Sequence, residues 1–209
     1  TITVEVNFRN YLKKEDITLA LTFDYGQKSA KKEIKAAKLI CDYYNIKHQV
    51  INLDWLKEIT TTSLVSNNEI PTNEMSQQSM RLVWVPNRNG LFLNIAASFA
   101  DAQNFDNIII GANKEEAETF SDNTQEFIDS INIEFKYSTP KKPKVIAPLI
   151  NLAKNDIVSL ALLRQVPLDL VMSCYQNIDG HCGICESCLR LKHALEVNNA
   201  QDWIEKIFR

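Results

Sequence analysis

Four of the five cysteines of the chain fall within fifteen residues, in the segment SCYQNIDGHCGICESC. Cys182, Cys185 and Cys188 follow one another at two-residue intervals, the spacing from which a tight loop can wrap a tetrahedral ion. Cys174 is close enough along the chain to supply a fourth ligand. Glycines between them permit the tight turns that such a loop requires. The spacing predicts a structural zinc site, here called the zinc knuckle, with a helix over residues 186–197 presenting Cys188 from its first turn.

Three other uses of these thiols remain open: a pair of disulfides, a redox Cys-x-x-Cys motif and an iron–sulfur cluster, since four thiolates also suit iron. Disulfides are typical of small secreted scaffolds, whereas this chain is long enough to fold without them. His181 and His193 lie beside the cysteines, and either could replace one as a ligand. With four thiols available, we predict that both are surface histidines. Cys41 stands alone and is predicted to be a core residue.

Length and composition bound the class of protein. The 209 residues, of which 45% are hydrophobic, can bury the core of a single α/β domain over residues 1–209, with the zinc knuckle at 174–188 inside it. The net charge of −3 argues against a broad nucleic-acid-binding surface but allows a local cationic site for a small anion. No apolar run approaches bilayer length, and the thiols suit a reducing compartment, so we expect a soluble, cytoplasmic protein.

Apolar runs that suit buried strands alternate with helical patterns along the chain. This alternation predicts an α/β fold in which a parallel sheet is flanked by helices on both faces. The pattern of residues 1–14 suits either a strand or the end of a helix, and the polar segment 63–79 suits a long loop. The expected strands are 17–23, 48–53, 107–111 and 145–150, and the expected helices are 28–44, 91–102, 123–137 and one that begins near 152.

Several polar residues are predicted at the ends of these elements, where open α/β sheets place their sites. Residues 24–27 follow the first strand. Arg88 lies at a helix entrance, where backbone N–H groups and a guanidinium favour an anion, although an ordinary surface arginine there is an equal alternative. Lys154 adds positive charge to a helix N-terminus that is already positive, which opposes stability but suits a phosphate. The acidic segment 112–122 suits either a solvated face or groups that orient a substrate or hold magnesium.

Five segments of the chain stand out together. They are LTFDYGQ at residues 21–27, VWVPNRNGLFLNIAASFA at 83–100, NKEEAETFSDNTQEFI at 113–128, APLINLAKNDI at 147–157 and the zinc knuckle. In this order they resemble the 7-cyano-7-deazaguanine synthase (QueC) family, nearly from end to end, and the wording EEAETF-SDN is similar to that of archaeal members. The resemblance implies an adenine nucleotide α-hydrolase-like fold of the N-type ATP pyrophosphatase group, usually as a homodimer with one zinc per chain.

The resemblance also implies an activity in queuosine or archaeosine biosynthesis. Family members use ATP with magnesium to adenylate the carboxylate of 7-carboxy-7-deazaguanine, let ammonia displace AMP, and use a second ATP to dehydrate the amide to a nitrile. Carried over to this chain, catalytic roles fall on Arg88 and Lys154, which would contact phosphate or substrate. Nucleotide or substrate contacts fall on Asp24, Tyr25, Gln27 and Asn89, and zinc ligation on Cys174, Cys182, Cys185 and Cys188.

One departure from the family pattern concerns the phosphate site. The family begins with an apolar strand and a Ser-Gly-Gly-x-Asp-Ser loop that cradles the ATP pyrophosphate, and the chain shows no counterpart. We expect that the sequence lacks its true N-terminus, which favours a helix over residues 1–14. The alternatives are a paralogue, as a binding module or defence-associated protein, that keeps the deazaguanine pocket but has lost or redirected the ATP chemistry, and a different zinc-bearing ATP pyrophosphatase that modifies tRNA.

Overall fold

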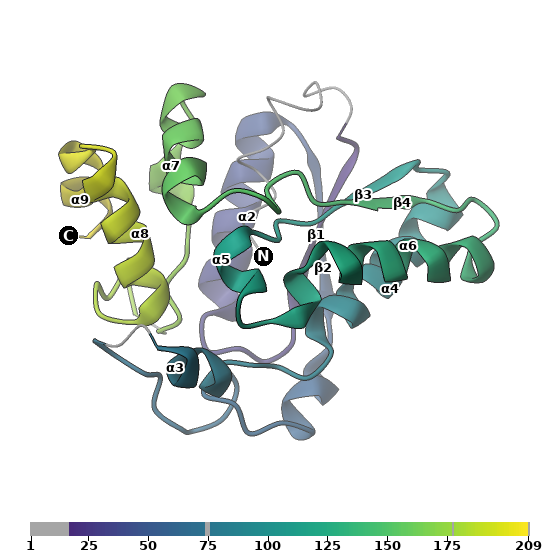
Figure 1. Ribbon diagram of the computed structural model, residues 1–209, viewed down its shortest axis with the longest axis horizontal. Coiled ribbons are helices and arrows are strands. Elements are labelled where there is room, and N and C mark those ends of the chain that lie inside the picture. Colours follow the sequence, from purple (N-terminus) through teal and green to yellow (C-terminus); the bar gives the residue numbers. More distant parts are fainter. Residues whose placement is uncertain (1–16, 74–75, 177, 209) are drawn as a thin grey trace.

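The computed structural model describes residues 17–73, 76–176 and 178–208 (Figure 1). The helix expected over residues 1–14 lies outside these ranges. Within them, no helix combines the length and the apolar character needed to cross a lipid bilayer.

The first part of the described chain is built on a parallel strand pair joined by a helix. β1 (Leu19–Asp24) and β2 (Lys47–Asn52) pair in parallel, with Phe23 opposite Ile51. α2 (Ala30–Tyr44) forms the crossover and packs against both strands. It ends at Asn45, which has a left-handed backbone conformation (φ 56°). Asparagine tolerates this conformation better than most residues do. This unit places the carboxyl ends of both strands at the same edge.

A second parallel pair follows. β3 (Asn107–Ile109) pairs with β4 (Lys144–Ile146), and the crossover between them contains α6 (Gln125–Ser138). α4 (Arg88–Gln103) packs against β3 and α6, and α6 packs against β4 (Figure 1). Phe135 of α6 and Val145 of β4 are almost wholly buried in the core between these elements.

Three helices form the C-terminal part. α7 (Lys154–Leu163) packs against α8 (Glu186–Val197), and α8 packs against α9 (Gln201–Ile207), at the side of the molecule away from β3 and β4 (Figure 1). Ala194 and Leu195 of α8 are fully buried at their centre. This layer carries the four-cysteine segment at the start of α8.

The α/β fold class predicted from the sequence, with parallel strands and flanking helices, is confirmed. Cys41 is buried on the inner side of α2, as predicted for a core residue. Three short helices were not predicted, because four to seven residues show too little periodicity to be separated from loop. Besides α9, they are α3 (Gln77–Leu82), which begins inside the expected loop 63–79, and α5 (Lys114–Ala117); the 3-10 helices are η3 (Asp54–Glu58), η4 (Ser121–Asn123) and η5 (Leu168–Leu170).

Candidate functional site

The four clustered cysteines converge as the sequence predicts. The sulfur atoms of Cys174, Cys182, Cys185 and Cys188 all lie within 4.8 Å of one another, and those of Cys182 and Cys188 are 3.9 Å apart. A tetrahedral ion with metal–sulfur bonds of about 2.3 Å holds its sulfurs about 3.8 Å apart, so the cluster fits such an ion closely. All four thiols are free, which excludes the disulfide alternative for this structure.

The backbone around the cluster stabilises negative sulfur. The N–H groups of Gln176 and Cys182 each donate to the Cys174 sulfur at 3.4 Å, and the Cys185 N–H donates to the Cys182 sulfur at 3.2 Å. Because the thiols of Cys185 and Cys188 also point at it, the pKa of Cys174 lies far below its ordinary value. Cys185 caps the N-terminus of α8, where the helix dipole favours a thiolate. The cluster can therefore hold a metal ion through four sulfurs.

Both neighbouring histidines lie outside the four-sulfur cluster. His193 is exposed on α8, as predicted. His181 is partly buried, its Nε2 accepts the Ser173 N–H at 3.2 Å, and burial lowers its pKa. The expected surface position is thus correct for His193, whereas His181 packs edge-on against Phe208. An isolated antiparallel bridge joins Thr72 to Cys185, so the segment before α3 is tied to the knuckle.

The turn after β1 is held by its own polar side chains. The Asp24 carboxylate accepts the Gly26 N–H at 3.0 Å, and the Gln27 amide accepts the Tyr25 N–H at 2.9 Å while donating to the Phe23 carbonyl at 3.1 Å. Gly26 adopts a left-handed backbone (φ 83°), which glycine accommodates without strain. Gln27 is buried, and its amide serves this turn. The turn fixes the buried Tyr25 ring beside the carboxyl end of the strand.

Arg88 begins α4, so the expected helix entrance is present. Its Nη1 donates to the Tyr25 hydroxyl at 3.3 Å, and its guanidinium lies 5.8 Å from the centre of the Tyr25 ring. Burial alone would lower the pKa of Arg88, but the oxygens of Tyr25, Tyr175 and Asp122 around it raise the pKa instead. Among the described residues, no carboxylate forms an ion pair with this guanidinium. A partly buried cation that lacks an ionic partner is suited to bind an anion.

Lys154 begins α7, as the sequence predicts. Its backbone N–H donates to Glu115 at 2.8 Å, and Lys154 lines a cavity. Glu115 also pairs with Arg190 at 2.9 Å, and Arg190 pairs with the buried Glu186 at 3.0 Å. This network joins the start of α7 to the first turns of α8 and so links the Lys154 position to the cysteine segment.

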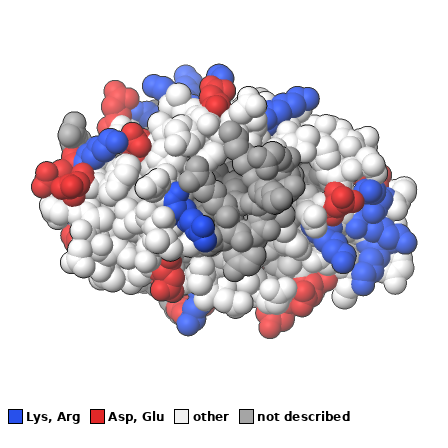
Figure 2. All heavy atoms as spheres, turned by 90° about the horizontal axis from the view of Figure 1, so that it is seen from above, with Lys and Arg blue, Asp and Glu red and all other residues white. Residues whose placement is uncertain are grey.

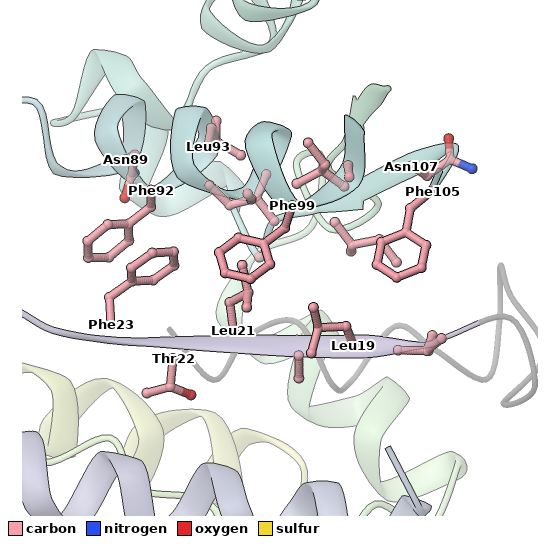
Figure 3. A pocket seen from close by; sticks show the side chains of 18 of the residues that line it. Leu19, Leu21, Thr22, Phe23, Asn89, Phe92, Leu93, Phe99, Phe105 and Asn107 are labelled. Atoms are coloured by element: carbon pink, nitrogen blue, oxygen red, sulfur yellow. The ribbon is translucent and has the colours of Figure 1, made fainter. Parts of the chain in front are cut away.

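A cavity of about 620 Å³, here called the larger cavity, lies between β1 and the layer formed by α4 and β3. Leu21 and Phe23 of β1 point toward Phe92 and Phe99 of α4, and the Phe23 and Phe92 rings stack at 4.0 Å (Figure 3). Thr22 points to the other side of the strand, because successive side chains of a β-strand alternate between its two faces (Figure 3). This cavity is apolar along β1 and polar where the strands end.

The smaller cavity, about 230 Å³, lies between the β1 turn, α4, α7 and α8. Tyr25, Arg88 and Lys154 line it together, although they are far apart in the sequence. Asn89 lines the larger cavity, and its amide donates to the Asp122 carbonyl at 3.3 Å. Asp24 and Gln27 line neither cavity and reach the site only through the turn that holds Tyr25.

The two cavities share a set of polar residues at their boundary, here called the junction. It lies at the carboxyl ends of β1 and β3, which is the edge where parallel α/β sheets place their sites. The junction consists of Glu33, Arg88, Glu116 and Asn123. It brings a guanidinium and carboxylates into contact with both cavities.

Sequence reasoning missed several residues of the smaller cavity. Trp84 and Phe120 stack there with ring centres 5.3 Å apart, and the partly buried Tyr175 directly follows Cys174 of the cluster. Glu186 and Arg190 are four residues apart on α8, a spacing at which opposite charges on a helix lie close enough to pair. Tyr175 and Arg190 could have been found from their proximity to the knuckle, whereas the stacking of Trp84 on Phe120 depends on tertiary structure.

The charged surface around the site is mixed. In the view from above, Lys and Arg side chains form several separate groups between Asp, Glu and uncharged residues, with a large group at the right-hand end (Figure 2).

The fold and site together define an α/β protein with a four-cysteine metal-type cluster next to charged cavities at its strand ends. Residues 8–199 match the family model of the queuosine biosynthesis protein QueC. The chain is 48% identical over 201 residues to the 7-cyano-7-deazaguanine synthase of Carboxydothermus hydrogenoformans, covering 93% of this chain and 92% of that protein. It is 43% identical over 199 residues to the synthase of Methanosarcina barkeri, covering 90% and 86%. The chain belongs to the QueC family.

Among solved structures, the chain is similar to the U34-tRNA thiolase NcsA from Methanococcus maripaludis with its 4Fe-4S cluster. The TM-score is 0.44 and the sequence identity 18%, over 91% of this chain and 56% of that chain.

Proposed function

We propose that the protein is a 7-cyano-7-deazaguanine synthase, which uses ATP and ammonia to convert the carboxylate of 7-carboxy-7-deazaguanine into a nitrile. Relatives that are 42–48% identical over most of the chain carry this name. The observation that carries the proposal is the junction, where Arg88 faces two cavities at once. A reaction that joins a nucleotide to a second small molecule needs two such spaces with a cation between them.

The chemistry explains why a cation is needed there. A carboxylate is a poor electrophile, so one of its oxygens attacks the α-phosphorus of ATP and pyrophosphate leaves. Ammonia then attacks the acyl carbon, and AMP leaves with that oxygen to give an amide. In the second round the amide oxygen attacks the α-phosphorus of ATP and pyrophosphate leaves, and loss of AMP and of both amide protons then forms the nitrile. Negative charge develops on phosphate oxygens in both rounds, and preorganised cations stabilise it.

Arg88 and Lys154 supply these cations in our proposal. The guanidinium of Arg88 can bind two oxygens in a fixed fork, which suits the carboxylate or the α-phosphate at the junction. Lys154 lies at the N-terminus of a ten-residue helix, where the helix dipole adds to its charge. Magnesium with ATP adds further positive charge at the departing pyrophosphate when bound.

The remaining predicted residues act through the turn and the helix entrance. Tyr25 holds Arg88 through its hydroxyl, while Asp24 and Gln27 fix the turn that presents Tyr25. Asn89 tethers the start of α4 to the Asp122 backbone. We therefore propose that Asp24, Tyr25, Gln27 and Asn89 shape the nucleotide and substrate site, and that Tyr25 and Asn89 lie nearest to the ligands.

We propose that the cysteine cluster holds one zinc ion per chain. Four sulfur ligands close the coordination shell, which is typical of structural zinc and leaves no position for substrate. The cluster supports the smaller cavity, because Tyr175 and Glu186 line that cavity and adjoin Cys174 and Cys185 in the chain. We further propose that the chain is a single domain that works as a cytoplasmic homodimer.

The test uses the full-length gene product with 7-carboxy-7-deazaguanine, ATP, magnesium and an ammonium salt. Mass spectrometry should detect the nitrile, and the amide should appear before it. Reactions without ATP or without ammonia are the controls. Binding of the deazaguanine without any ATP-dependent product would contradict the proposal and favour a binding protein.

A further inference from the structure

One carboxylate of the smaller cavity has a different environment from the others. Glu116, at the end of α5, lines both cavities at the junction. Its backbone N–H donates to Asn113 at 3.2 Å, but within the described residues its carboxylate has no hydrogen-bond or ion-pair partner. Both of its oxygens are therefore available to accept hydrogen bonds from a molecule in the cavity.

The other acidic residues of this cavity are already engaged. Glu33 accepts from the Ser29 hydroxyl at 2.5 Å and from the Gln27 amide at 3.0 Å. Asp122 accepts from the Asn123 amide at 3.0 Å, and Glu186 pairs with Arg190 at 3.0 Å. Among the acidic side chains that line the described part of this cavity, Glu116 is thus the one whose two oxygens can still accept all their hydrogen bonds from a ligand.

The surroundings of Glu116 favour a flat ring. Trp84 and Phe120 lie in the cavity wall as a nearly parallel pair, with an angle of 20° between their planes. Tyr175 is partly buried and lines the same wall. A planar heterocycle in this cavity therefore meets aromatic surfaces and a free carboxylate together.

Building on the proposed function, we propose that Glu116 determines specificity by accepting two parallel hydrogen bonds from the ring N1–H and the exocyclic 2-amino group of the deazaguanine. A carboxylate has only acceptors, and this edge of a guanine-type base presents two adjacent donors. The match excludes the adenine of ATP, whose corresponding edge combines a donor with an acceptor. Arg88 binds the carboxylate end of the same molecule, so Glu116 and Arg88 define its direction in the cavity.

The test compares two ligands on the full-length protein by isothermal titration calorimetry. The first is 7-carboxy-7-deazaguanine, and the second is the analogue that lacks the 2-amino group. The wild-type protein should bind the first at least about tenfold more tightly, since a lost partner leaves a charged acceptor unpaired. Glu116→Gln should lose about tenfold or more in affinity for the first ligand and little for the second. Glu118→Gln, an exposed change of the same kind in the same segment, is the matched control and should behave as wild type.

The outcomes separate this inference from the proposed function. If wild type binds and converts the carboxylate substrate while Glu116→Gln keeps the same preference between the ligands, Glu116 does not recognise this edge although the activity stands. Equal loss for both ligands would also overturn the inference, because the effect would then be structural. If wild type binds neither ligand, the proposed function itself fails. Circular dichroism and metal content, unchanged from wild type, establish that the Gln variant is folded.

Discussion

The cysteine cluster and the junction between the cavities differ in how their polar groups are satisfied. The cluster takes all four of its sulfur atoms from residues 174–188, and three of its cysteines are almost inaccessible. The junction is assembled from residues of α2, α4, α5 and η4, and it leaves the Arg88 guanidinium and the Glu116 carboxylate without ionic partners among the described residues. In our proposal the cysteine cluster forms a closed metal site that stabilises the fold, whereas the junction becomes complete only when it binds its small-molecule ligands.

The largest effect should follow from breaking the closed site. Replacing Cys185 with Ser removes a ligand that is also the N-cap of α8. Since metal binding at such a site is coupled to folding, we expect loss of the bound zinc and unfolding of the C-terminal helices at a lower temperature. Metal analysis and thermal unfolding provide the measurements.

Cys41→Ala is the control, because Cys41 is a core residue outside the cluster and should leave the metal content unchanged. Iron with a visible charge-transfer band in the wild-type protein would contradict the zinc assignment. Full zinc content in Cys185→Ser would contradict the four-sulfur site.

An intermediate effect should follow from breaking the open site. Arg88→Ala should reduce kcat/KM for the carboxylate substrate by about 100-fold, the effect of removing a desolvated charge that pairs with a ligand. Lys154→Ala should cost about tenfold, because its ammonium can be partly replaced by solvent and the helix N-terminus. Both variants should unfold at the wild-type temperature, since both residues lie at helix ends.

Lys192→Ala, an exposed change on α8, is the matched control. Unchanged kinetics in Arg88→Ala would show that Arg88 is an ordinary residue at a helix start and does not bind the substrate. The contrast between the two regions would then be lost.

The smallest effect concerns Asp122 and pH in the ligand-free protein. Burial raises the pKa of this carboxyl above its ordinary value of 3.8, although Arg88 opposes the shift. The folded state then holds the proton more tightly than the unfolded state. The free energy of unfolding should therefore fall as pH rises from about 3.8 through the raised pKa.

Asp122→Asn should remove this part of the pH dependence and slightly stabilise the protein at neutral pH, as measured by urea unfolding across a pH series. Asp129→Asn on the exposed face of α6 should leave the profile unchanged. A profile for Asp122→Asn with the wild-type slope would show that the carboxyl is solvated.

The same contrast explains what the sequence could and could not predict. The cluster was predictable in full because its ligands are close in the chain, and the positions of Arg88 and Lys154 followed from helix-start signals. The contacts that surround the smaller cavity, Trp84 against Phe120 and Arg190 against Glu115, join residues that are 36 and 75 positions apart in the sequence. No local pattern encodes such a contact, since it depends on how the helices pack.

The proposed reaction is tested most directly by the fate of the carboxylate oxygens. When 7-carboxy-7-deazaguanine labelled with oxygen-18 in both carboxylate positions is converted by the full-length protein, each adenylation transfers one of these oxygens to AMP. Mass spectrometry should then find AMP with a single heavy oxygen and two such AMP molecules per nitrile. Unlabelled AMP, or release of ADP in its place, would contradict an adenylated carboxylate and with it the role assigned to the junction.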